Sequence, residues 1–284
     1  MLKVHFGVIS GKFASVSASS ITPRGLVPPA APLVAGLAAW QRQVEGASAT
    51  LICVHGGLDR GGSFARIARR SEHFNVVAYD RRGYQGSRGR QPIDLNGHID
   101  DLCAIATAVQ SLGPVIVLGH SYGGVVAIGA ALRRPDLFAL LVTYEAPLPW
   151  IYRRPGFTND LHEDPSEEAE QFFRRMVSSA AWDRLSNDDK ASRRADGIAL
   201  LDDLRTLRGS APYELATLEI PCVYAYGDGP HQIYYEELVQ HLVATSPVFR
   251  ATSLLAANHG AHLSNPDQLL KLITDEWTHL CALP

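Results

Sequence analysis

Short apolar segments alternate with amphipathic segments along most of the chain. Apolar runs of roughly four to eight residues, bounded by glycine, proline or polar residues, are typical of strands buried on both faces of a parallel sheet. Such runs predict strands at residues 50–55, 75–80, 114–120, 139–144, 222–226 and 248–255. Helical periodicity predicts helices at residues 63–70, 98–112, 122–134, 233–244 and 266–281. This alternation predicts an α/β fold, with a mostly parallel central sheet and helices on both faces.

One polar, helical segment interrupts the alternation between two predicted strands. The sequence Pro165-Ser166-Glu167-Glu168 is typical of a helix start, and apolar residues follow it on one face. The segment is too long for a plain connection between strands. We therefore predict that residues 147–220 form a helical cap over the carboxyl ends of the strands, where open α/β sheets bind ligands.

The cap divides the predicted α/β core into residues 37–146 and 221–284. Residues 1–36 come before the core and are rich in serine, proline and alanine, with four prolines between Pro23 and Pro32. We expect these residues to form an extended N-terminal extension that packs loosely.

Composition and charge narrow the class of protein. The chain has 284 residues, of which 46% are hydrophobic and 19% charged, as in ordinary globular proteins. Its net charge of -3 argues against a nucleic-acid-binding protein, which normally carries a basic excess. No apolar run is long enough to span a bilayer, and the broken apolar stretch of the first 20 residues is too weak to predict a signal peptide. We expect a cytoplasmic protein without a membrane or nucleic-acid partner; a monomer and a homodimer are both compatible with the sequence.

The four cysteines are widely spaced along the chain. They are Cys53, Cys103, Cys222 and Cys281, and the first three fall in apolar runs. This pattern indicates free thiols in a reducing compartment, not a disulfide framework or a metal site. We expect neither a cofactor nor a metal.

Residues 119–123 carry the strongest chemical signal in the chain. They read Gly-His-Ser-Tyr-Gly, directly after an apolar run and directly before a helix-like stretch. In this context G-x-S-x-G is a nucleophile elbow, a sharp turn that exposes a serine hydroxyl. We predict that Ser121 is a nucleophile.

A serine nucleophile needs a base and an acid that orients the base, in the chain order serine, acid, histidine. His259 lies four residues after the end of the last predicted strand and is the preferred base, whereas His262 is expected beside the site or facing substrate. Two carboxylates follow strands in suitable places, Glu145 and Asp228. A glutamate at the end of a buried strand is costly without a partner, which favours Glu145. Asp228 lies between glycines and is also readily explained as a turn residue.

A glycine turn after the first predicted strand provides a candidate oxyanion hole. The sequence is Val54-His55-Gly56-Gly57-Leu58. Backbone N–H groups of Gly57 and Tyr122 are the predicted donors to an oxyanion. The turn does not fit the phosphate-binding patterns G-x-x-x-x-G-K-[ST] or G-x-G-x-x-G.

Together these motifs resemble the α/β-hydrolase superfamily, from about residue 37 to the C-terminus. The matching blocks are the glycine turn at His55, residues 80–87, the elbow at Ser121 and the His259 loop. In similar family members the catalytic histidine commonly precedes a proline by seven positions, as His259 precedes Pro266.

The chain departs from many family members in the position of the acid. Many relatives carry it in a Gly-x-x-Asp turn after the strand that follows the cap, where this chain has Pro230. The resemblance to relatives whose acid follows the strand after the elbow, such as some haloalkane dehalogenases, strengthens Glu145. Dehalogenases and epoxide hydrolases use aspartate at the elbow, so Ser121 argues against both activities.

We therefore predict a serine hydrolase that cleaves a small to medium acyl substrate, a carboxylic ester, lactone or thioester, through an acyl-enzyme on Ser121. The alternatives are a carbon–carbon bond hydrolase with the same triad and a ligand-binding protein that has lost turnover. Histidines near the motifs and aromatic residues of the cap are candidates for the substrate pocket. They are His55, His120, Trp150, Tyr152, Phe157, Phe172, Trp182 and His262.

Overall fold

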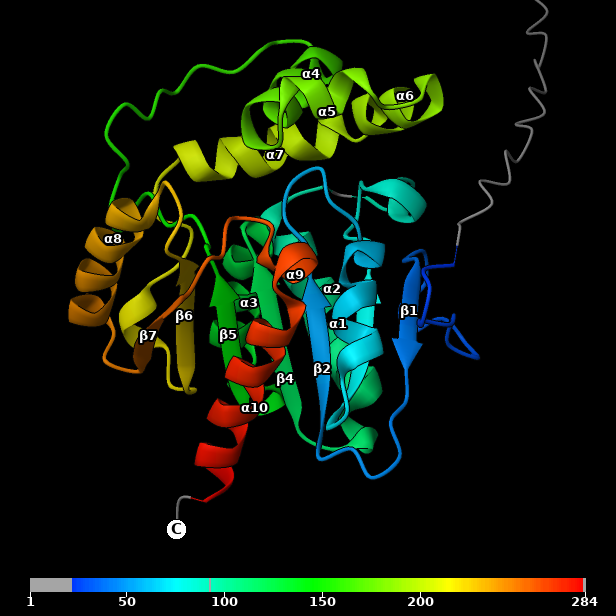
Figure 1. Ribbon diagram of the computed structural model, residues 1–284, viewed down its shortest axis with the longest axis vertical. Helices are drawn as coiled ribbons and strands as arrows, with labels where there is room; N and C mark the ends of the chain where they lie inside the picture. Colours follow the sequence, from blue (N-terminus) through cyan, green and yellow to red (C-terminus); the bar gives the residue numbers. More distant parts are fainter. Residues whose placement is uncertain (1–21, 92, 283–284) are drawn as a thin grey trace, which may run out of the picture.

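The computed structural model describes residues 22–91 and 93–282 (Figure 1). Residues 1–21 of the predicted N-terminal extension lie outside the described residues. The described part contains a seven-stranded sheet in the order β1-β3-β2-β4-β5-β6-β7. Its strands are β1 Ala39–Arg42, β2 Ala49–Val54, β3 Phe74–Tyr79, β4 Val115–His120, β5 Leu140–Tyr144, β6 Cys222–Gly227 and β7 Phe249–Leu254. All neighbours pair in parallel except β1, which is antiparallel to β3, and the predicted fold class is confirmed.

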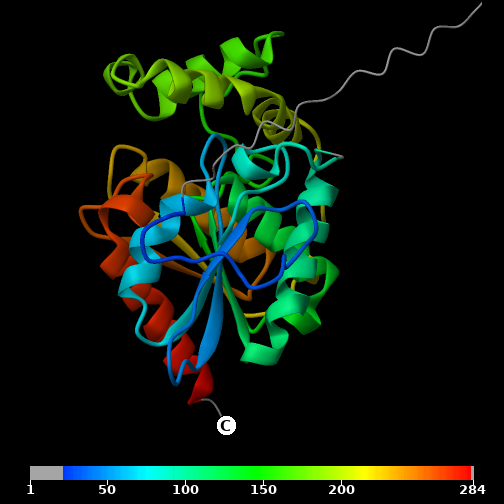
Figure 2. The same cartoon turned by 90° about the vertical axis from the view of Figure 1, so that its right-hand side faces the viewer.

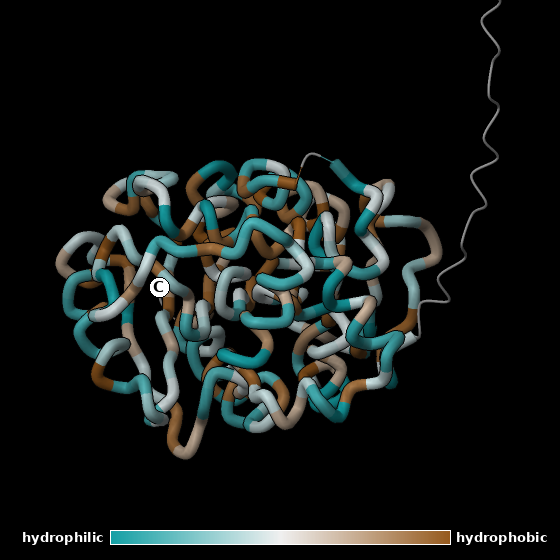
Figure 3. Tube along the Cα trace, turned by 90° about the horizontal axis from the view of Figure 1, so that it is seen from above, coloured by the Kyte–Doolittle hydropathy of each residue, from teal (hydrophilic) through white to brown (hydrophobic). Residues whose placement is uncertain are grey.

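Helices cover both faces of the sheet (Figure 2). Side chains of a strand alternate between the two faces, so Ile52 and Val54 of β2 pack in one hydrophobic core while Leu51 and Cys53 pack in the other. The first core is closed by α2 Leu95–Val109, α3 Tyr122–Arg133 and α8 Gln232–Thr245. The second is closed by α1 Ala65–Arg70 and α10 Pro266–Cys281, with the short helix α9 Ala261–Ser264 before α10. In the view from above, hydrophobic stretches cross the middle of the molecule (Figure 3).

Helix α2 begins three residues before its predicted start because Asp94 caps it. The Asp94 carboxylate accepts the Gly97 N–H at 2.6 Å, which satisfies one of the free amides of the first turn. At the other end the last predicted turn tightens into a 3-10 helix, Gln110–Leu112.

The edge of the sheet differs from the prediction. Strand β1 was not predicted because it has only four residues and buries only Trp40. The chain before it packs more closely than expected. Val27 exchanges two backbone hydrogen bonds with Gln41, and Leu26 is buried in the second core. The described end of the extension is therefore anchored to the sheet.

Helices α4 Pro165–Met176, α5 Ser179–Asp183, α6 Asn187–Ala195 and α7 Gly197–Arg208 lie above the carboxyl ends of the strands (Figure 1). The Asp164 side chain caps α4, and Pro165 occupies its first turn. The cap helices share a small core that includes Phe173, Trp182 and Leu200. Within the described residues no helix combines the length and apolar character of a membrane span.

Candidate active site

Ser121 lies at the sharp turn between β4 and α3. Its φ of 52° and ψ of -126° form a strained conformation for a residue with a side chain. The Ser121 N–H donates to the Tyr144 carbonyl at 2.9 Å, and its carbonyl accepts the Gly124 N–H at 2.8 Å, so the turn is held on both sides. Glycine is required at position 123, where a Cβ would lie 2.1 Å from the Val54 carbonyl oxygen. The geometry is that of a nucleophile elbow.

Glu145 directly follows β5 and contacts His259. The Glu145 carboxylate is buried; its Oε1 accepts the Gly227 N–H at 3.0 Å, and its Oε2 lies 2.6 Å from His259 Nδ1. A carboxylate accepts only, so Nδ1 carries the proton of this bond. This leaves Nε2 of a neutral His259 free to accept a proton.

Asp228 does not contact His259. Its carboxylate accepts the Ala257 N–H at 3.3 Å, and its own N–H donates to the Leu254 carbonyl at 3.1 Å. Asp228 therefore braces the chain that leads to His259. Of the two candidate acids, the structure brings Glu145 to the histidine.

Two further side chains hold the backbone of the His259 loop. The Tyr144 hydroxyl donates to the Asn258 carbonyl at 2.8 Å. The His120 ring donates from Nε2 to the His259 carbonyl at 2.7 Å. Both residues end parallel strands, so the sheet fixes the position of the loop.

The glycine turn after β2 lies against the elbow. A Cβ on Gly56 would lie 2.8 Å from the Ser121 Cβ, which explains why glycine is needed there. Gly57, Ser121, Tyr122 and His259 all line one cavity. The predicted oxyanion donors, Gly57 and Tyr122, therefore face the same space as the serine.

His55 hydrogen-bonds within the glycine turn and is not among the residues that line the cavity. It is fully buried, its Nδ1 donates to the Gly56 carbonyl at 2.7 Å, and its Nε2 accepts the Arg81 N–H at 2.9 Å. Burial and the adjacent Arg81 guanidinium lower the pKa of His55 to about 3. His55 is thus a neutral structural residue and not part of the substrate pocket.

A buried ion pair joins the same turn to the cap. The Arg81 guanidinium donates to the His55 carbonyl at 2.9 Å and to the Asp203 carboxylate of α7 at 2.6 and 3.1 Å. The Tyr84 hydroxyl donates to Asp203 at 2.6 Å. Burial by itself would raise the pKa of Asp203, but Arg81 and His98 lower it to about 2. Asp203 is therefore ionised at neutral pH and binds the cap to the core.

The cavity lies between core and cap and has a volume of about 570 Å³. This falls within the usual range for small-molecule pockets. Two of the predicted pocket residues line it, Phe157 and Phe172. The cap contributes further apolar side chains that were not predicted: Met176, Leu200, Leu204 and Leu207.

The three other aromatic residues predicted for the pocket pack elsewhere. Trp182 is buried in the cap core, 5.4 Å from the Phe173 ring. Trp150 packs edge-on against Tyr213, and Tyr152 stacks on His241 at 5.1 Å. These aromatic rings are covered by neighbouring rings instead of by substrate space. Their positions in the sequence did not indicate these packing partners.

His120 and His262 also lie outside the cavity lining. Their rings contact each other, with centroids 4.2 Å apart, and both are buried. Asp59, which the sequence analysis did not consider, lies beside them.

Polar residues that were not predicted also line the cavity. They are Arg154, Asp160, Arg175, Asp203, Arg208, His231, Tyr234 and Tyr235. Leu200, Leu204 and Leu207 of α7 follow helical spacing, so a signal for that face was present in the sequence. The arginines gave no comparable signal because charged residues in a cap helix are usually solvated.

Comparison with known proteins agrees with this fold. The sequence model described as the alpha/beta hydrolase family matches residues 51–272. A pimeloyl-[acyl-carrier protein] methyl ester esterase of Pectobacterium carotovorum is 31% identical over 249 residues, covering 79% of this chain and 93% of the esterase. Lipase LipV of Mycobacterium tuberculosis is 33% identical over 102 residues, covering 36% of this chain and 39% of the lipase.

Other matches are partial or concern the fold alone. With the lipase and two further hydrolase relatives, the chain aligns over 39%, 54% and 61% of the relative's own length. A lipase-esterase related protein from Clostridium acetobutylicum has a similar structure, with a TM-score of 0.62 at 17% identity, covering 85% of this chain and 99% of that chain. The family match covers most of the sheet, the elbow and the His259 loop. The chain therefore belongs to the alpha/beta hydrolase family.

Proposed function

We propose that this chain is a serine hydrolase that cleaves a small to medium acyl substrate, such as a carboxylic ester, lactone or thioester. The observation that carries the proposal is the 2.6 Å contact between Glu145 and His259, at the cavity that Ser121 also lines. A carboxylate, an imidazole and a serine in this order form the arrangement that activates a hydroxyl for acyl transfer. No cofactor is required for this chemistry.

In the acylation step, Ser121 Oγ attacks the substrate carbonyl carbon and transfers its proton to His259 Nε2. Glu145 holds the imidazole in the tautomer that can accept this proton and stabilises the imidazolium that forms. The backbone N–H groups of Gly57 and Tyr122 donate to the developing oxyanion, each contributing roughly 2.7–4 kcal/mol. The imidazolium then protonates the leaving alcohol or thiol as its bond to the acyl carbon breaks.

In the deacylation step, His259 takes a proton from water, and the resulting hydroxide attacks the acyl carbon. The ester bond to Ser121 breaks, and the imidazolium returns the proton to Ser121 Oγ. The carboxylic acid leaves, and the free serine is regenerated.

Ester hydrolysis is preferred to the two alternatives. The names of the relatives include a methyl ester esterase and a lipase, which supports acyl transfer to water. A binding protein without turnover would not need a carboxylate aligned on His259. Carbon–carbon bond hydrolysis would use the same residues, but no observed contact favours it.

The proposal is tested with p-nitrophenyl esters of increasing acyl length and with a thioester, using the wild type and Ser121→Ala. We expect turnover by the wild type, with a preference for short and medium chains that fit the cavity. Ser121→Ala should retain only background hydrolysis. Equal rates for the two proteins on every substrate would contradict the proposal.

A further inference from the structure

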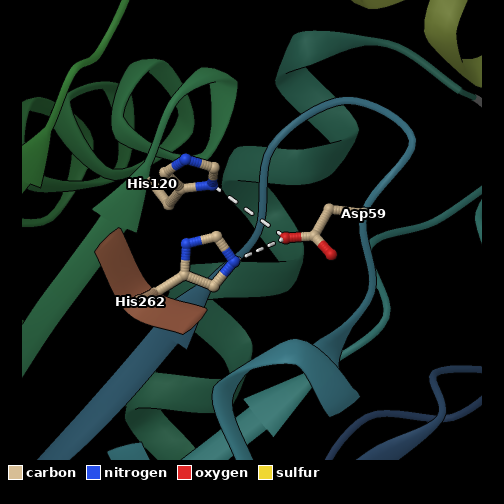
Figure 4. A group of neighbouring side chains, drawn as sticks. All are labelled: Asp59, His120 and His262. Carbon is tan, nitrogen blue, oxygen red and sulfur yellow. Dashed lines mark ion pairs between the residues drawn. The ribbon is translucent and has the colours of Figure 1, made fainter. Parts of the chain in front are cut away.

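Asp59, His120 and His262 form a cluster of three potential metal ligands (Figure 4). None of the three is among the residues that line the cavity. Asp59 follows the glycine turn after β2, His120 ends β4, and His262 belongs to α9. His262 Nε2 lies 3.2 Å from Asp59 Oδ2, and His120 Nδ1 lies 4.0 Å from the same oxygen. All three ligand atoms lie within 4.8 Å of one another.

The hydrogen bond of His120 determines which of its nitrogens can act as a ligand. Nε2 donates to the His259 carbonyl at 2.7 Å, because a carbonyl can only accept. In the neutral ring Nδ1 then carries the lone pair, and this nitrogen faces the Asp59 carboxylate. His120 is 6% exposed, and within the described residues its Nδ1 has no hydrogen-bond partner. Two hydrogen-bond acceptors, His120 Nδ1 and Asp59 Oδ2, thus face each other with no donor from the described residues between them.

His262 is also buried without hydrogen-bond partners for its ring nitrogens among the described residues. It is 3% exposed, and neither ring nitrogen has a hydrogen-bond partner among the residues that the structure describes. Its Nε2 is near the Asp59 carboxylate but is not aligned with it as a hydrogen bond. Buried polar atoms without partners cost free energy and call for an explanation such as a bound ion.

We propose that Asp59, His120 and His262 bind one divalent transition-metal ion, with Zn²⁺ as the best match to two imidazole nitrogens and a carboxylate oxygen. Ligand atoms about 2.1 Å from one zinc ion lie roughly 3.4 Å apart at a tetrahedral angle, and at most about 4.2 Å apart when they are on opposite sides of the ion. The distances from Asp59 to both histidines fall within this limit. The ligand atoms lie at most 4.8 Å apart, so side-chain movements of roughly 1.4 Å in total bring even the widest pair to the tetrahedral separation.

The surroundings of the ligands fit a metal site. Metal-binding histidines usually donate their second nitrogen to a carbonyl or carboxylate, as His120 does to the His259 carbonyl. The Asp59 oxygen that faces both rings also accepts the Ser63 hydroxyl at 3.0 Å, which orients the carboxylate. The alternative to a metal ion is a proton shared between His262 and the Asp59 carboxylate. It would pair one histidine but leave His120 Nδ1 facing a carboxylate without a donor.

An ion at this place would join three segments of the site. Asp59 is two residues from Gly57, His120 precedes Ser121, and His262 is three residues after His259. The ion would touch no reacting atom and would act by holding these segments in position. The proposal does not depend on the proposed hydrolase activity, because metal binding is measured without a substrate.

The test begins with the full chain, freed of metal by a chelator and then titrated with Zn²⁺ in a calorimeter. We expect one ion per chain. At a free Zn²⁺ concentration about 100 times Kd, the Tm should rise by roughly 5 °C. A stoichiometry well below one, or no change in Tm at saturating Zn²⁺, would overturn the proposal.

Substitutions of the proposed ligands test whether the ion binds at this cluster. Asp59→Asn and His262→Gln should each weaken Zn²⁺ binding by at least about 10-fold. The matched control is His162→Gln, because His162 lies 3.9 Å from Glu167 in an exposed pair and should not affect binding. Asp59 is the more exposed ligand, so Asp59→Asn supplies the answer if His262→Gln does not fold. Unchanged affinity in Asp59→Asn, or loss of binding only in His259→Gln, would show that the ion binds elsewhere.

Discussion

Glu145 makes the two contacts that a triad acid requires. One carboxylate oxygen is held by the Gly227 N–H, and the other faces His259 Nδ1. Its φ of 49° shows that the chain bends sharply at this residue to bring the carboxylate to the histidine. The sequence already favoured Glu145 over Asp228, because a glutamate at the end of a buried strand needs a partner, but the contact with His259 depends on the fold and is seen only in the structure.

Replacing Glu145 with glutamine should lower kcat by roughly 10³–10⁴-fold, because an amide no longer favours the tautomer with a free Nε2. Asp228→Asn is the matched control. Among the described residues its carboxylate accepts a hydrogen bond from the Ala257 N–H and makes none to His259, so kcat should fall by less than about 10-fold. Steady-state hydrolysis of p-nitrophenyl acetate measures both effects. A large fall confined to Asp228→Asn would contradict the assignment of Glu145.

Residue-level prediction was less successful for histidines and aromatic side chains. His55, His120 and His262 lie close to the motifs in the sequence, yet all three are buried outside the cavity lining. His55 and His120 hydrogen-bond to backbone carbonyls, and the His262 ring packs against His120. Proximity along the chain does not determine the direction of a side chain. Burial and hydrogen bonding decide it, and both depend on distant segments such as the loop that carries Asp59.

At the level of elements, α7 has the most direct influence on the cavity. Three of its four leucines line the cavity, while Asp203 on the same helix pairs with Arg81 of the core. The helical pattern of the cap was readable from the sequence. The docking of the cap on the core depends on the ion pair between Arg81 and Asp203, which are far apart in the sequence. The helical periodicity of the cap therefore could not predict it.

Asp203→Asn should lower the free energy of unfolding by about 3–5 kcal/mol, because it leaves the Arg81 guanidinium buried without its charge partner. Asp202→Asn is the matched control. It removes the same charge from the adjacent residue, which forms no ion pair among the described residues, and should change stability by about 0.5 kcal/mol or less. Urea unfolding at neutral pH measures both values. Equal stabilities of the two variants would contradict the role of the ion pair.

The same ion pair predicts a dependence of stability on pH. The pKa of Asp203 is lowered in the folded state from 3.8 to about 2. The stabilisation is therefore complete above about pH 5 and is lost as the pH falls through 4 towards 2, by about 2 kcal/mol in total. The stability difference between the wild type and Asp203→Asn should narrow over this range. A difference that stays constant down to pH 2 would contradict the lowered pKa.

At the scale of the whole molecule, the α/β core followed from the sequence because buried parallel strands leave continuous apolar runs. The sequence did not predict strand β1 or the packing of residues 22–36. These segments make their contacts through backbone pairing and through single buried side chains such as Leu26. The cavity likewise forms only when cap and core meet.

Two arginines of the cavity lining are candidates for binding an anionic group of a substrate. Arg154 and Arg208 both line it, and no carboxylate of the described residues lies within ion-pair distance of either guanidinium. We expect an ester whose acyl chain ends in a carboxylate to have a several-fold lower KM than its neutral isostere. Arg208→Gln should reduce this preference, whereas Arg69→Gln, on an exposed surface away from the cavity, should not. Equal KM values for the two esters would contradict this expectation.

The central claim is that Ser121 is the nucleophile, and the site of covalent labelling tests it most directly. Wild-type protein and Ser121→Ala are incubated with a fluorophosphonate, digested and analysed by mass spectrometry. The predicted result is one phosphonyl adduct per wild-type chain, on the peptide that contains Ser121, and none on Ser121→Ala. An unlabelled wild type, or an adduct on another residue that persists in Ser121→Ala, would contradict the account.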